Sequence, residues 1–409
     1  MKLSDFYDKN KRLLLIEKPF AKGDIMDFTP LKNVLDEITA WRIPGADIAV
    51  IKDNEVVFRY QAGYSDLENK KPISPDELYY LFSASKPITG AAAVLLAQEG
   101  KIRFEDEVGK YISSFNDIKV RVKNEDGSTA LVPAKRPVTI LDLLTMTAGL
   151  DYNLSSDSIL EVKERTNGRC PTVEIAEAIG REGLAFEPGE KFQYSLCLDI
   201  MGAVIEVASG MKFGEYLKTR FFEPLSTKHT TFNVTEELKA KIAPLYIYDN
   251  EVGKAVIKTA GNGYILGSEF EGGGAGLVST VGDYMKFVNM LTNLGLSDDG
   301  TRIMSEESVN FMRKNQLNDS QMQNFWSGWK YLTGFGYGCG VRTALKPELV
   351  KGYFSFGEFG WCGAAGAMVI ADPRNKLSVY YAQHMQNSFE WVVHPKLREA
   401  VYKSVGLLS

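Results

Sequence analysis

The chain has 409 residues, and at roughly 150 residues per domain this length predicts two or three structural units. Its composition, 44% hydrophobic and 24% charged, is that of an average globular protein, which excludes disorder, collagen and coiled coil as the dominant character. The 47 Lys and Arg residues are outnumbered by 52 Asp and Glu, for a net charge of −5, so nucleic acid is not expected as a partner.

Cysteine and histidine are both scarce. Four cysteines are too few for a disulfide framework, and no two of them form a CxxC pair. The three histidines do not lie at the short separations from one another or from the cysteines that are typical of zinc ligands. We therefore expect neither a metal nor a cofactor. These residues are Cys170, Cys197, Cys339, Cys362, His229, His384 and His394.

The N-terminus carries no recognisable secretion or membrane signal. Its apolar run, 13–16, is short, is flanked by charges and lacks a small-residue cleavage site. No window of the chain approaches a membrane-spanning length of uncharged apolar residues. We therefore expect a soluble cytoplasmic protein with no membrane partner, and leave its oligomeric state open.

The first 28 residues read as an extension ahead of the main fold. Residues 47–52 (DIAVIK) and 55–60 (EVVFRY) are β-rich runs on either side of Asp53-Asn54, a pattern that predicts a hairpin. Residues 83–100 (SASKPITGAAAVLLAQEG) predict an apolar helix that ends at a glycine. Because Pro87 is tolerated only near a helix start, that helix should begin at about Ser83.

The middle of the chain is mostly helical, and the C-terminal third returns to strands. Residues 364–371 and 377–384 predict a second hairpin around the turn 372–375. A last helix is predicted from Pro395 to Val405, since Pro suits the first helical position. Further helices are predicted at 139–147, 172–179, 199–216 and 280–294, with a Gly-rich run at 272–276.

Strands at both ends with helices between them predict an α/β (α+β) fold. One α/β lobe would comprise residues 29–100 and 262–409, and an inserted helical lobe residues 101–261. Ligand sites favour the cleft between two such lobes, and we expect the active site there.

Elimination leaves one nucleophilic motif. The chain has no GxSxG, Walker or GxGxxG motif and few histidines for a triad. Ser-x-x-Lys occurs three times, at Ser83/Lys86, Ser209/Lys212 and Ser327/Lys330. The second match meets a helix stop at Gly210, and the third lies in a Trp- and Gly-rich stretch without a helical period. Only the first opens a strong apolar helix.

The pair Ser83 and Lys86 suits nucleophilic catalysis. Residues three apart share a helix face, so the amine can reach the hydroxyl. A serine hydroxyl needs a base, and burial together with the helix dipole favours the neutral amine that can act as one. The alternative is a capping serine beside a solvated lysine.

Two more segments fit an acyl-transfer site. Tyr194, in 187–195 (EPGEKFQYS), offers a phenol that can relay the proton of Ser83, although a packing role is the alternative. The small residues of 359–366 (FGWCGAAG) let a backbone approach a ligand. The N–H groups of Ser83 and Ala364 are candidates for an oxyanion hole. The alternative is a Gly-rich strand packed on a helix.

In this order, these three elements resemble the penicillin-recognising serine hydrolases, which include class C β-lactamases, DD-peptidases and family VIII carboxylesterases. The resemblance covers about 29–408 and implies a β-lactamase/DD-peptidase-like fold, with a central antiparallel sheet flanked by helices and an inserted, mostly helical lobe. Supporting stretches are 143–150 (LLTMTAGL), 273–280 (GGAGLVST) and 371–373 (ADP).

The resemblance also implies roles. Ser83 would be the acylated nucleophile, Lys86 its general base and Tyr194 the proton relay, with the N–H groups of Ser83 and Ala364 as the oxyanion hole. The substrate-binding strand motif, Lys-Thr-Gly in the family, would be replaced by Trp361, Cys362 and Gly363.

Two departures from the family pattern bear on the substrate. Leu196 stands where β-lactamases and DD-peptidases carry the Asn of Tyr-x-Asn, and Trp361 stands where they carry a Lys. A buried substrate carboxylate would lack a cation, which disfavours β-lactams and D-Ala termini. Trp361 together with the Tyr-Ser-x-x-x-Asp pattern from Tyr194 to Asp199 resembles the family VIII esterases and lovastatin-type acyltransferases. Cys362 departs from their more usual Gly.

The remaining distinctive residues read as structural. His229 stands where relatives often have Asp, and 334–340 (GFGYGCG) resembles a strand of the family sheet. Trp326, Trp329 and Tyr331 can line an acyl pocket, but core packing is slightly favoured.

We therefore expect a serine hydrolase that works through an acyl-enzyme, an esterase on small to medium acyl esters. Its partner would be a small-molecule ester or amide. An amide-directed relative (D-amino-acid amidase, weak β-lactamase or DD-peptidase) or an acyltransferase would share the acyl-enzyme. A non-catalytic binding protein on this fold is the alternative from another class, and the presence of Ser83, Lys86 and Tyr194 together argues against it.

Overall fold

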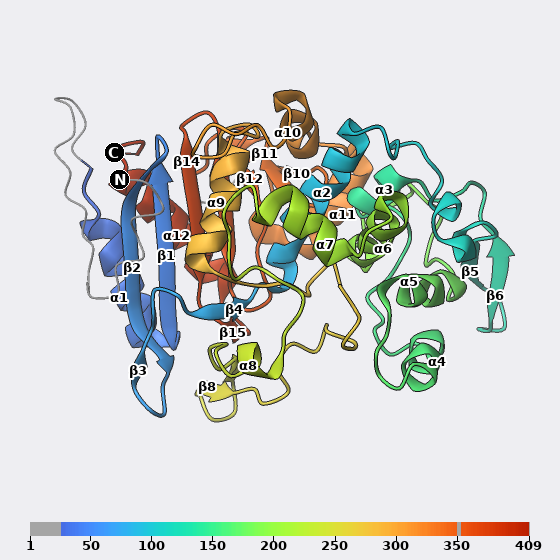
Figure 1. Cartoon of the computed structure of the whole chain (residues 1–409), viewed down its shortest axis with the longest axis horizontal. Helices are drawn as coiled ribbons and strands as arrows, with labels where there is room; N and C mark the ends of the chain where they lie inside the picture. The colour runs from blue at the N-terminus through green and yellow to red at the C-terminus, as the bar shows by residue number, and fades with distance from the viewer. Residues whose placement is uncertain (1–25, 350–352, 409) are drawn as a thin grey trace.

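A computed structural model describes residues 26–349 and 353–408, and one eight-stranded antiparallel sheet lies at its centre (Figure 1). The strand order is β10-β11-β12-β13-β14-β1-β2-β3, so that the two ends of the chain meet where β1 pairs with β14. The strands are β1 (Gly45–Lys52), β2 (Glu55–Asp66), β3 (Lys71–Pro72), β10 (Phe335–Tyr337), β11 (Arg342–Ala344), β12 (Phe359–Gly360), β13 (Met368–Asp372) and β14 (Leu377–Ala382).

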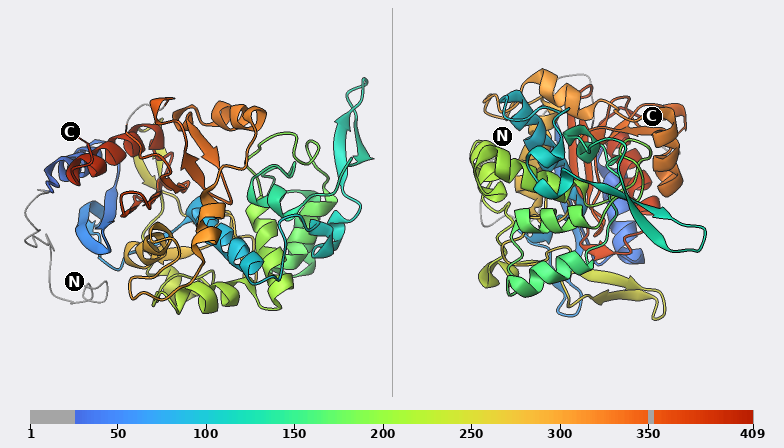
Figure 2. Two further views of the ribbon diagram at one scale, coloured as in Figure 1. Left: turned by 90° about the horizontal axis from the view of Figure 1, so that it is seen from above. Right: turned by 90° about the vertical axis from the view of Figure 1, so that its right-hand side faces the viewer.

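Three small sheets supplement the large one. Strand β4 (Leu78–Tyr80) pairs with β9 (Val278–Thr280) just before the Ser83 segment. The hairpin of β5 (Lys119–Lys123) and β6 (Thr129–Pro133) projects from the helical side of the molecule (Figure 2). The third sheet has the order β15-β7-β8, with β15 (Met385–Gln386), β7 (Tyr246–Asp249) and β8 (Lys254–Ile257).

Strand β1 shows how the sheet separates two hydrophobic layers. Successive side chains of a strand point to opposite faces. Ile48 and Val50 belong to the core shared with α1 (Thr29–Trp41) and α12 (Glu390–Ser404), whereas Ala49 and Ile51 belong to the core on the opposite face. Because both faces are covered, the strand is buried at every position except its last residue, Lys52.

The second layer contains the helix that follows Ser83. A 3₁₀ turn, η2 (Phe82–Ser85), leads into α2 (Lys86–Gln98), of which every residue from Lys86 to Leu96 is buried. A helix that is apolar all round is a core helix. Helix α2 packs against α6 (Cys197–Ser209) and α10 (Glu306–Arg313), whereas α3 (Ile140–Leu144) packs against α6 and α9 (Val281–Thr292) packs on β13 and β14. The remaining α-helices are α4 (Asp157–Arg165), α5 (Thr172–Arg181), α7 (Phe213–Leu217), α8 (Glu236–Lys239) and α11 (Asp319–Gly328).

The antiparallel sheet flanked by helices confirms the predicted fold class, and the hairpin at Asp53-Asn54 is also confirmed. Both turn residues are left-handed, with φ of 53° and 64°. The second hairpin is present as β13 and β14, but the strand prediction for 364–367 is wrong. Those residues form a turn because Gly366 is left-handed (φ 88°) and donates its N–H to the Gly363 carbonyl.

Three helix predictions need correction. The expected helix 199–216 is broken because Gly210 is left-handed (φ 73°) and stops α6. The last helix begins at Glu390, five residues before Pro395, because the left-handed Phe389 (φ 53°) starts the first turn. Ser327 lies in α11, which the sequence was not expected to form and which a capping box between Asn318 and Gln321 begins.

Most of the predicted N-terminal extension, residues 1–25, lies outside the described residues. Met26 and Phe28 pack against the core, and the Asp27 N–H donates to the Ser404 carbonyl at 3.0 Å. These three residues therefore belong to the fold. Among the described residues, no helix is long and apolar enough to cross a membrane.

A buried ionic cluster fixes α12 to the sheet. The fully buried Glu358 accepts hydrogen bonds from Arg398 at 3.2 Å and Tyr402 at 3.0 Å, both on α12. Arg342 of β11 lies 3.5 Å from the same carboxylate. Removing one member of such a cluster leaves its partners buried and unpaired, which costs more than losing a surface ion pair.

Replacing Glu358 with Ala should therefore lower the free energy of unfolding by about 3–5 kcal/mol, since two guanidinium groups lose their carboxylate. Urea denaturation followed by circular dichroism measures this loss. The matched control is Glu399→Ala, an exposed carboxylate on the same helix, which should change stability by less than about 0.5 kcal/mol. Equal losses in the two variants would contradict the role given to the cluster.

Candidate active site

The segment before α2 exposes Ser83 while it buries its neighbours. Phe82 is fully buried and left-handed (φ 48°), a conformation that is rare for a bulky residue. The next residue, Ser83, is partly exposed, and the chain then enters the buried helix at Lys86. The hydroxyl of Ser83 is therefore accessible at the start of a core helix.

Lys86 lies directly beneath this serine and is fully buried. Its Nζ lies 3.3 Å from Ser83 Oγ and donates to the Gly274 carbonyl at 2.7 Å. Burial disfavours the ammonium and lowers the pKa of Lys86 to about 8, although the charge of Asp199 opposes that shift. An appreciable fraction of the amine is therefore neutral near physiological pH and able to accept the serine proton.

The Gly-rich run at 272–276 completes the environment of this lysine. The Gly274 N–H donates to Asp199 Oδ1 at 3.0 Å while its carbonyl accepts from Lys86. A Cβ on Gly274 would lie 2.3 Å from Asp199 Oδ2, so only glycine fits between the two charges. Burial raises the pKa of Asp199, and the nearby Lys86 acts against that rise.

Tyr194 reaches the same serine from the segment just before α6. Its hydroxyl accepts the Trp361 indole N–H at 3.1 Å, and it lies near enough to Ser83 for that side chain to influence the pKa of the phenol. Burial raises the pKa of this phenol well above its usual value of 10, and Ser83 and Trp361 lower it. Tyr194 is therefore a protonated phenol at neutral pH, placed to give a proton to a group bound at Ser83.

An aromatic cluster surrounds this phenol. The ring of Tyr194 stacks on Trp361 at 5.7 Å and on Tyr152 at 5.8 Å, and meets Trp329 edge-on at 5.1 Å. Trp361 is only 2% exposed, so it contacts Tyr194 and the core and presents little surface to a substrate. Its indole brings a hydrogen-bond donor without a charge.

The two residues after Trp361 lie beside the Ser83 turn. Cys362 is partly exposed, and Gly363 is buried against the Leu81 carbonyl, which a Cβ would approach to 2.5 Å. Ala364 is exposed in the turn that follows, not on a strand as expected. Among the described residues, neither the Ser83 nor the Ala364 N–H donates to a protein acceptor, so both stay available for an oxyanion.

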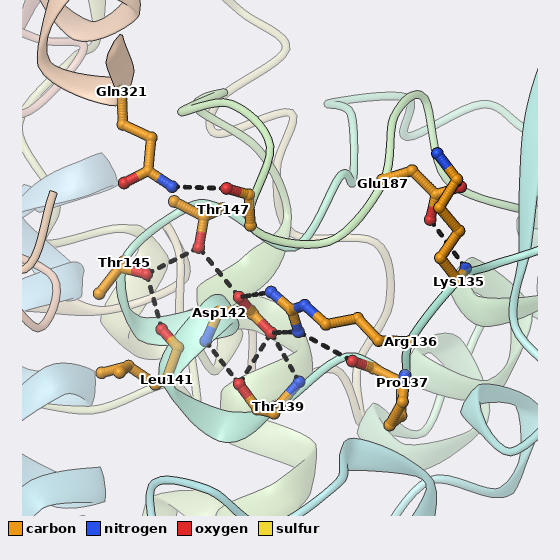
Figure 3. Close-up of polar contacts among 11 residues, drawn as sticks. Lys135, Arg136, Pro137, Thr139, Leu141, Asp142, Thr145, Thr147, Glu187 and Gln321 are labelled. Atoms are coloured by element: carbon orange, nitrogen blue, oxygen red, sulfur yellow. Dashed lines mark hydrogen bonds and ion pairs between the residues drawn. The ribbon is translucent and has the colours of Figure 1, made fainter. Parts of the chain in front are cut away.

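A polar network surrounds the buried Asp142 of α3 (Figure 3). Asp142 accepts from both terminal nitrogens of Arg136, at 2.7 and 2.8 Å, and from the hydroxyl of Thr147 at 3.2 Å. The Thr147 carbonyl accepts the Gly189 N–H at 2.8 Å, which ties the 187–196 segment to this network.

Three other residues that the sequence pointed to, Leu196, Ser209 and Ser327, make contacts that stabilise the fold. Leu196 is 2% exposed and lines a separate small pocket with Leu150 and Asp151. In the described part of the chain, Ser209 and Ser327 make no hydrogen bond to the lysine of their motif. Ser209 accepts from the Met211 N–H, and Ser327 donates to the Asn324 carbonyl.

Sequence reasoning missed one phenol and the role of one carboxylate. Tyr152 places its hydroxyl 3.4 Å from Lys86 Nζ, and Asp199 sets the charge around that lysine. Tyr152 lies two residues after the stretch 143–150, which was the available signal. Across residues 26–349 and 353–408, no group of three or more His, Cys, Asp or Glu side chains is placed to hold a metal ion.

An antiparallel sheet between helical layers, with a Ser-x-x-Lys pair at the start of a buried helix, is the arrangement of the β-lactamase-fold serine hydrolases. The family model described as Beta-lactamase matches residues 31–403, and the chain belongs to this family.

Its relatives and structural neighbours fit this assignment. Protein Rv1367c of Mycobacterium tuberculosis is 30% identical over 354 residues, which cover 85% of this chain and 88% of that protein. EstCE1, described as a hydrolase with promiscuous acyltransferase activity, superposes with a TM-score of 0.73 at 23% identity and covers 91% of this chain and 97% of its own. Simvastatin synthase (LovD) from Aspergillus terreus gives 0.74 at 20% identity, with the same shares covered. At these identities the two structures support the fold alone.

The rate at which a fluorophosphonate labels the protein should rise with pH and level off above about 8, because only the neutral amine of Lys86 can take the serine proton. Replacing Asp199 with Asn removes the negative charge that favours the ammonium, and it should shift this titration to lower pH. Labelling followed from pH 5.5 to 9.5 by intact-protein mass spectrometry measures both curves. A flat profile, or a shift to higher pH in Asp199→Asn, would contradict the role of Lys86.

Proposed function

We propose that the protein is an esterase that hydrolyses small to medium acyl esters through an acyl-enzyme on Ser83. The observation that carries this proposal is the buried Lys86 amine, 3.3 Å from a partly exposed serine hydroxyl. In this reaction Ser83 Oγ attacks the ester carbonyl while its proton passes to Lys86 Nζ. The N–H groups of Ser83 and Ala364 would stabilise the negative charge on the carbonyl oxygen.

Tyr194 would complete the step. It donates its proton to the alkoxide as the ester C–O bond breaks, and Lys86 then returns a proton to the phenol. Water next attacks the acyl carbonyl, and the acid leaves as Ser83 regains its proton. Trp361 would be a positioning residue, because its N–H fixes the phenol oxygen and eases the loss of the Tyr194 proton.

The side chains around the site favour neutral esters over β-lactams and peptides. Trp361 supplies no charge for a substrate carboxylate, and Leu196 supplies no amide. Arg342 is buried and bound to Glu358, so it offers no replacement cation. A substrate with a carboxylate beside the scissile bond would therefore bury an unpaired charge.

Acyl transfer to an alcohol is the second candidate. It would use the same acyl-enzyme, and the rings of Tyr152, Trp329 and Trp361 around Tyr194 favour it because they limit water at the proton relay. The neighbour EstCE1 is described as having both activities. Adding butanol to the assay and measuring butyl ester against free acid separates the two reactions.

Ser83→Ala should reduce p-nitrophenyl butyrate hydrolysis by at least about 10³-fold, because the nucleophile is lost. Circular dichroism should show unchanged folding. The control is Ser327→Ala, the exposed serine of another Ser-x-x-Lys match, which should keep full activity. Equal turnover by the wild type and Ser83→Ala would exclude Ser83 as nucleophile. A silent wild type that also fails to react with a fluorophosphonate would support a non-catalytic binding protein.

Trp361→Phe should lower kcat/KM for the same ester by about tenfold, the effect of one hydrogen bond to a group that changes protonation in the reaction. The smaller ring still packs on Tyr194, so the thermal midpoint should change little. Trp329→Phe is the matched control, since Trp329 touches the same ring edge-on. Equal losses in both variants would show that packing, not the indole N–H, matters.

A further inference from the structure

The turn that carries the Ala364 N–H lies against the segment just before α2. A Cβ on Gly363 would approach the Leu81 carbonyl oxygen to 2.5 Å, so the two backbones are in direct contact. Ala365, on the other side of Ala364, packs in one small hydrophobic cluster with Phe82. The direction of the Ala364 N–H therefore depends on the conformation of this turn.

Backbone hydrogen bonds close the turn 363–366. The left-handed Gly366 (φ 88°) donates its N–H to the Gly363 carbonyl at 2.8 Å. The Met385 N–H donates to the Ala365 carbonyl at 3.0 Å. Because Gly366 closes the turn, a change in its conformation would move the residues between it and Gly363.

The buried His394 of α12 contacts the far end of this turn. Its Nε2 lies 3.1 Å from the Gly366 carbonyl oxygen, which accepts no other hydrogen bond among the described residues. A carbonyl oxygen can only accept, so Nε2 carries the proton and donates it to this bond. His394 is 4% exposed, and burial lowers its pKa to about 3, so the ring stays neutral near physiological pH.

Gln383 fills the space on another side of Gly366. A Cβ on Gly366 would lie 2.2 Å from Gln383 Cδ, so only glycine fits there. The Gln383 side chain is itself fixed, because it donates to the Ser388 carbonyl and accepts from the Tyr381 hydroxyl, both at 2.8 Å. Gly366 is therefore packed tightly on this side, while His394 supplies the donor for its carbonyl.

Loss of the His394 donor would leave the Gly366 carbonyl buried without a hydrogen bond, a state that folded proteins avoid. Glycine has the conformational freedom to rotate this peptide group toward another donor. That rotation would open the turn and redirect the Ala364 N–H. A group that stabilises a reacting atom must be held to within about 0.5 Å of its productive position, so a small movement suffices to weaken it.

We propose that His394 is a positioning residue, which holds the turn 363–366 so that the Ala364 N–H points at the carbonyl oxygen of an ester bound at Ser83. The inference rests on the proposed esterase function and adds a residue to it. His394 acts through the Gly366 carbonyl and not on the substrate.

Two esters that differ in one atom test this role. In O-(4-nitrophenyl) thionobutyrate, sulfur replaces the carbonyl oxygen of p-nitrophenyl butyrate. Sulfur accepts hydrogen bonds weakly, so the donors of an oxyanion hole accelerate hydrolysis of the oxygen ester far more. The wild type should favour the oxygen ester by about 10²-fold in kcat/KM, the contribution of one such donor.

Two amide variants differ in whether they reach the Gly366 carbonyl. His394→Gln places an amide N–H near the position of Nε2 and should keep the preference for the oxygen ester within about twofold. His394→Asn is one methylene shorter and should reduce the preference by at least about tenfold, through slower hydrolysis of the oxygen ester. His394→Leu, which has no donor and buries no unpaired amide, should show the same loss and replaces the Asn variant if that variant does not fold.

Tyr402→Phe controls for a general loss of stability. It removes buried hydrogen bonds to Glu358 and Asp372 from the other end of the same helix, and it should keep the preference. Equal preferences in His394→Gln and in the variant without a donor in reach would overturn the role of His394, even if both esters are hydrolysed more slowly. A wild type that hydrolyses the two esters equally would overturn it too, and either result leaves the esterase intact. Failure of the wild type to hydrolyse either ester would overturn the proposed function and this inference with it.

Discussion

The burial of the Lys86 side chain is the constraint on which the rest of the site depends. An amine buried in an apolar core loses much of its preference for the charged form. When it is charged, protein groups must accept its hydrogen bonds and balance its charge. The Gly274 carbonyl at 2.7 Å and the nearby Asp199 do so. Position 274 requires glycine, because a side chain there would collide with the Asp199 carboxylate. The same burial leaves the lysine able to act as a base toward Ser83.

The fold supplies this environment from segments that are far apart in the sequence. The apolar helix α2 is buried behind the large sheet and carries Lys86 in its first turn. Tyr194 comes from the segment before α6, and Trp361 comes from the end of β12. The Asp142 network holds the 139–147 segment and, through Thr147 and Gly189, the segment with Tyr194. Helical layers and sheet thus position one hydroxyl, one amine and one phenol together.

Much of this arrangement could be predicted from the sequence, because the burial and the start of a helix depend on residues that are neighbours along the chain. The apolar run after Ser83 and the position of Pro87 indicate a buried helix that begins near the serine. The parts that failed depend on single backbone conformations or on tertiary contacts. Gly210 adopts a left-handed conformation that ends α6, and Gly366 adopts one that replaces the start of a predicted strand with a turn. Phe389 is left-handed without being glycine, and α12 begins directly after it. Tyr152 could not be assigned because only the folded chain brings its hydroxyl to Lys86.

Membership of the Beta-lactamase family establishes the fold, whereas the function depends on the side chains of the site. The central claim is that Ser83 is acylated with Lys86 as its base. The most direct measurement is peptide mass spectrometry of protein mixed with p-nitrophenyl butyrate and quenched in acid within milliseconds. The account predicts a butyryl group on the peptide that contains Ser83, absent from Ser83→Ala and formed far more slowly in Lys86→Met. A butyryl group on another residue, or equal rates of formation with and without Lys86, would contradict it.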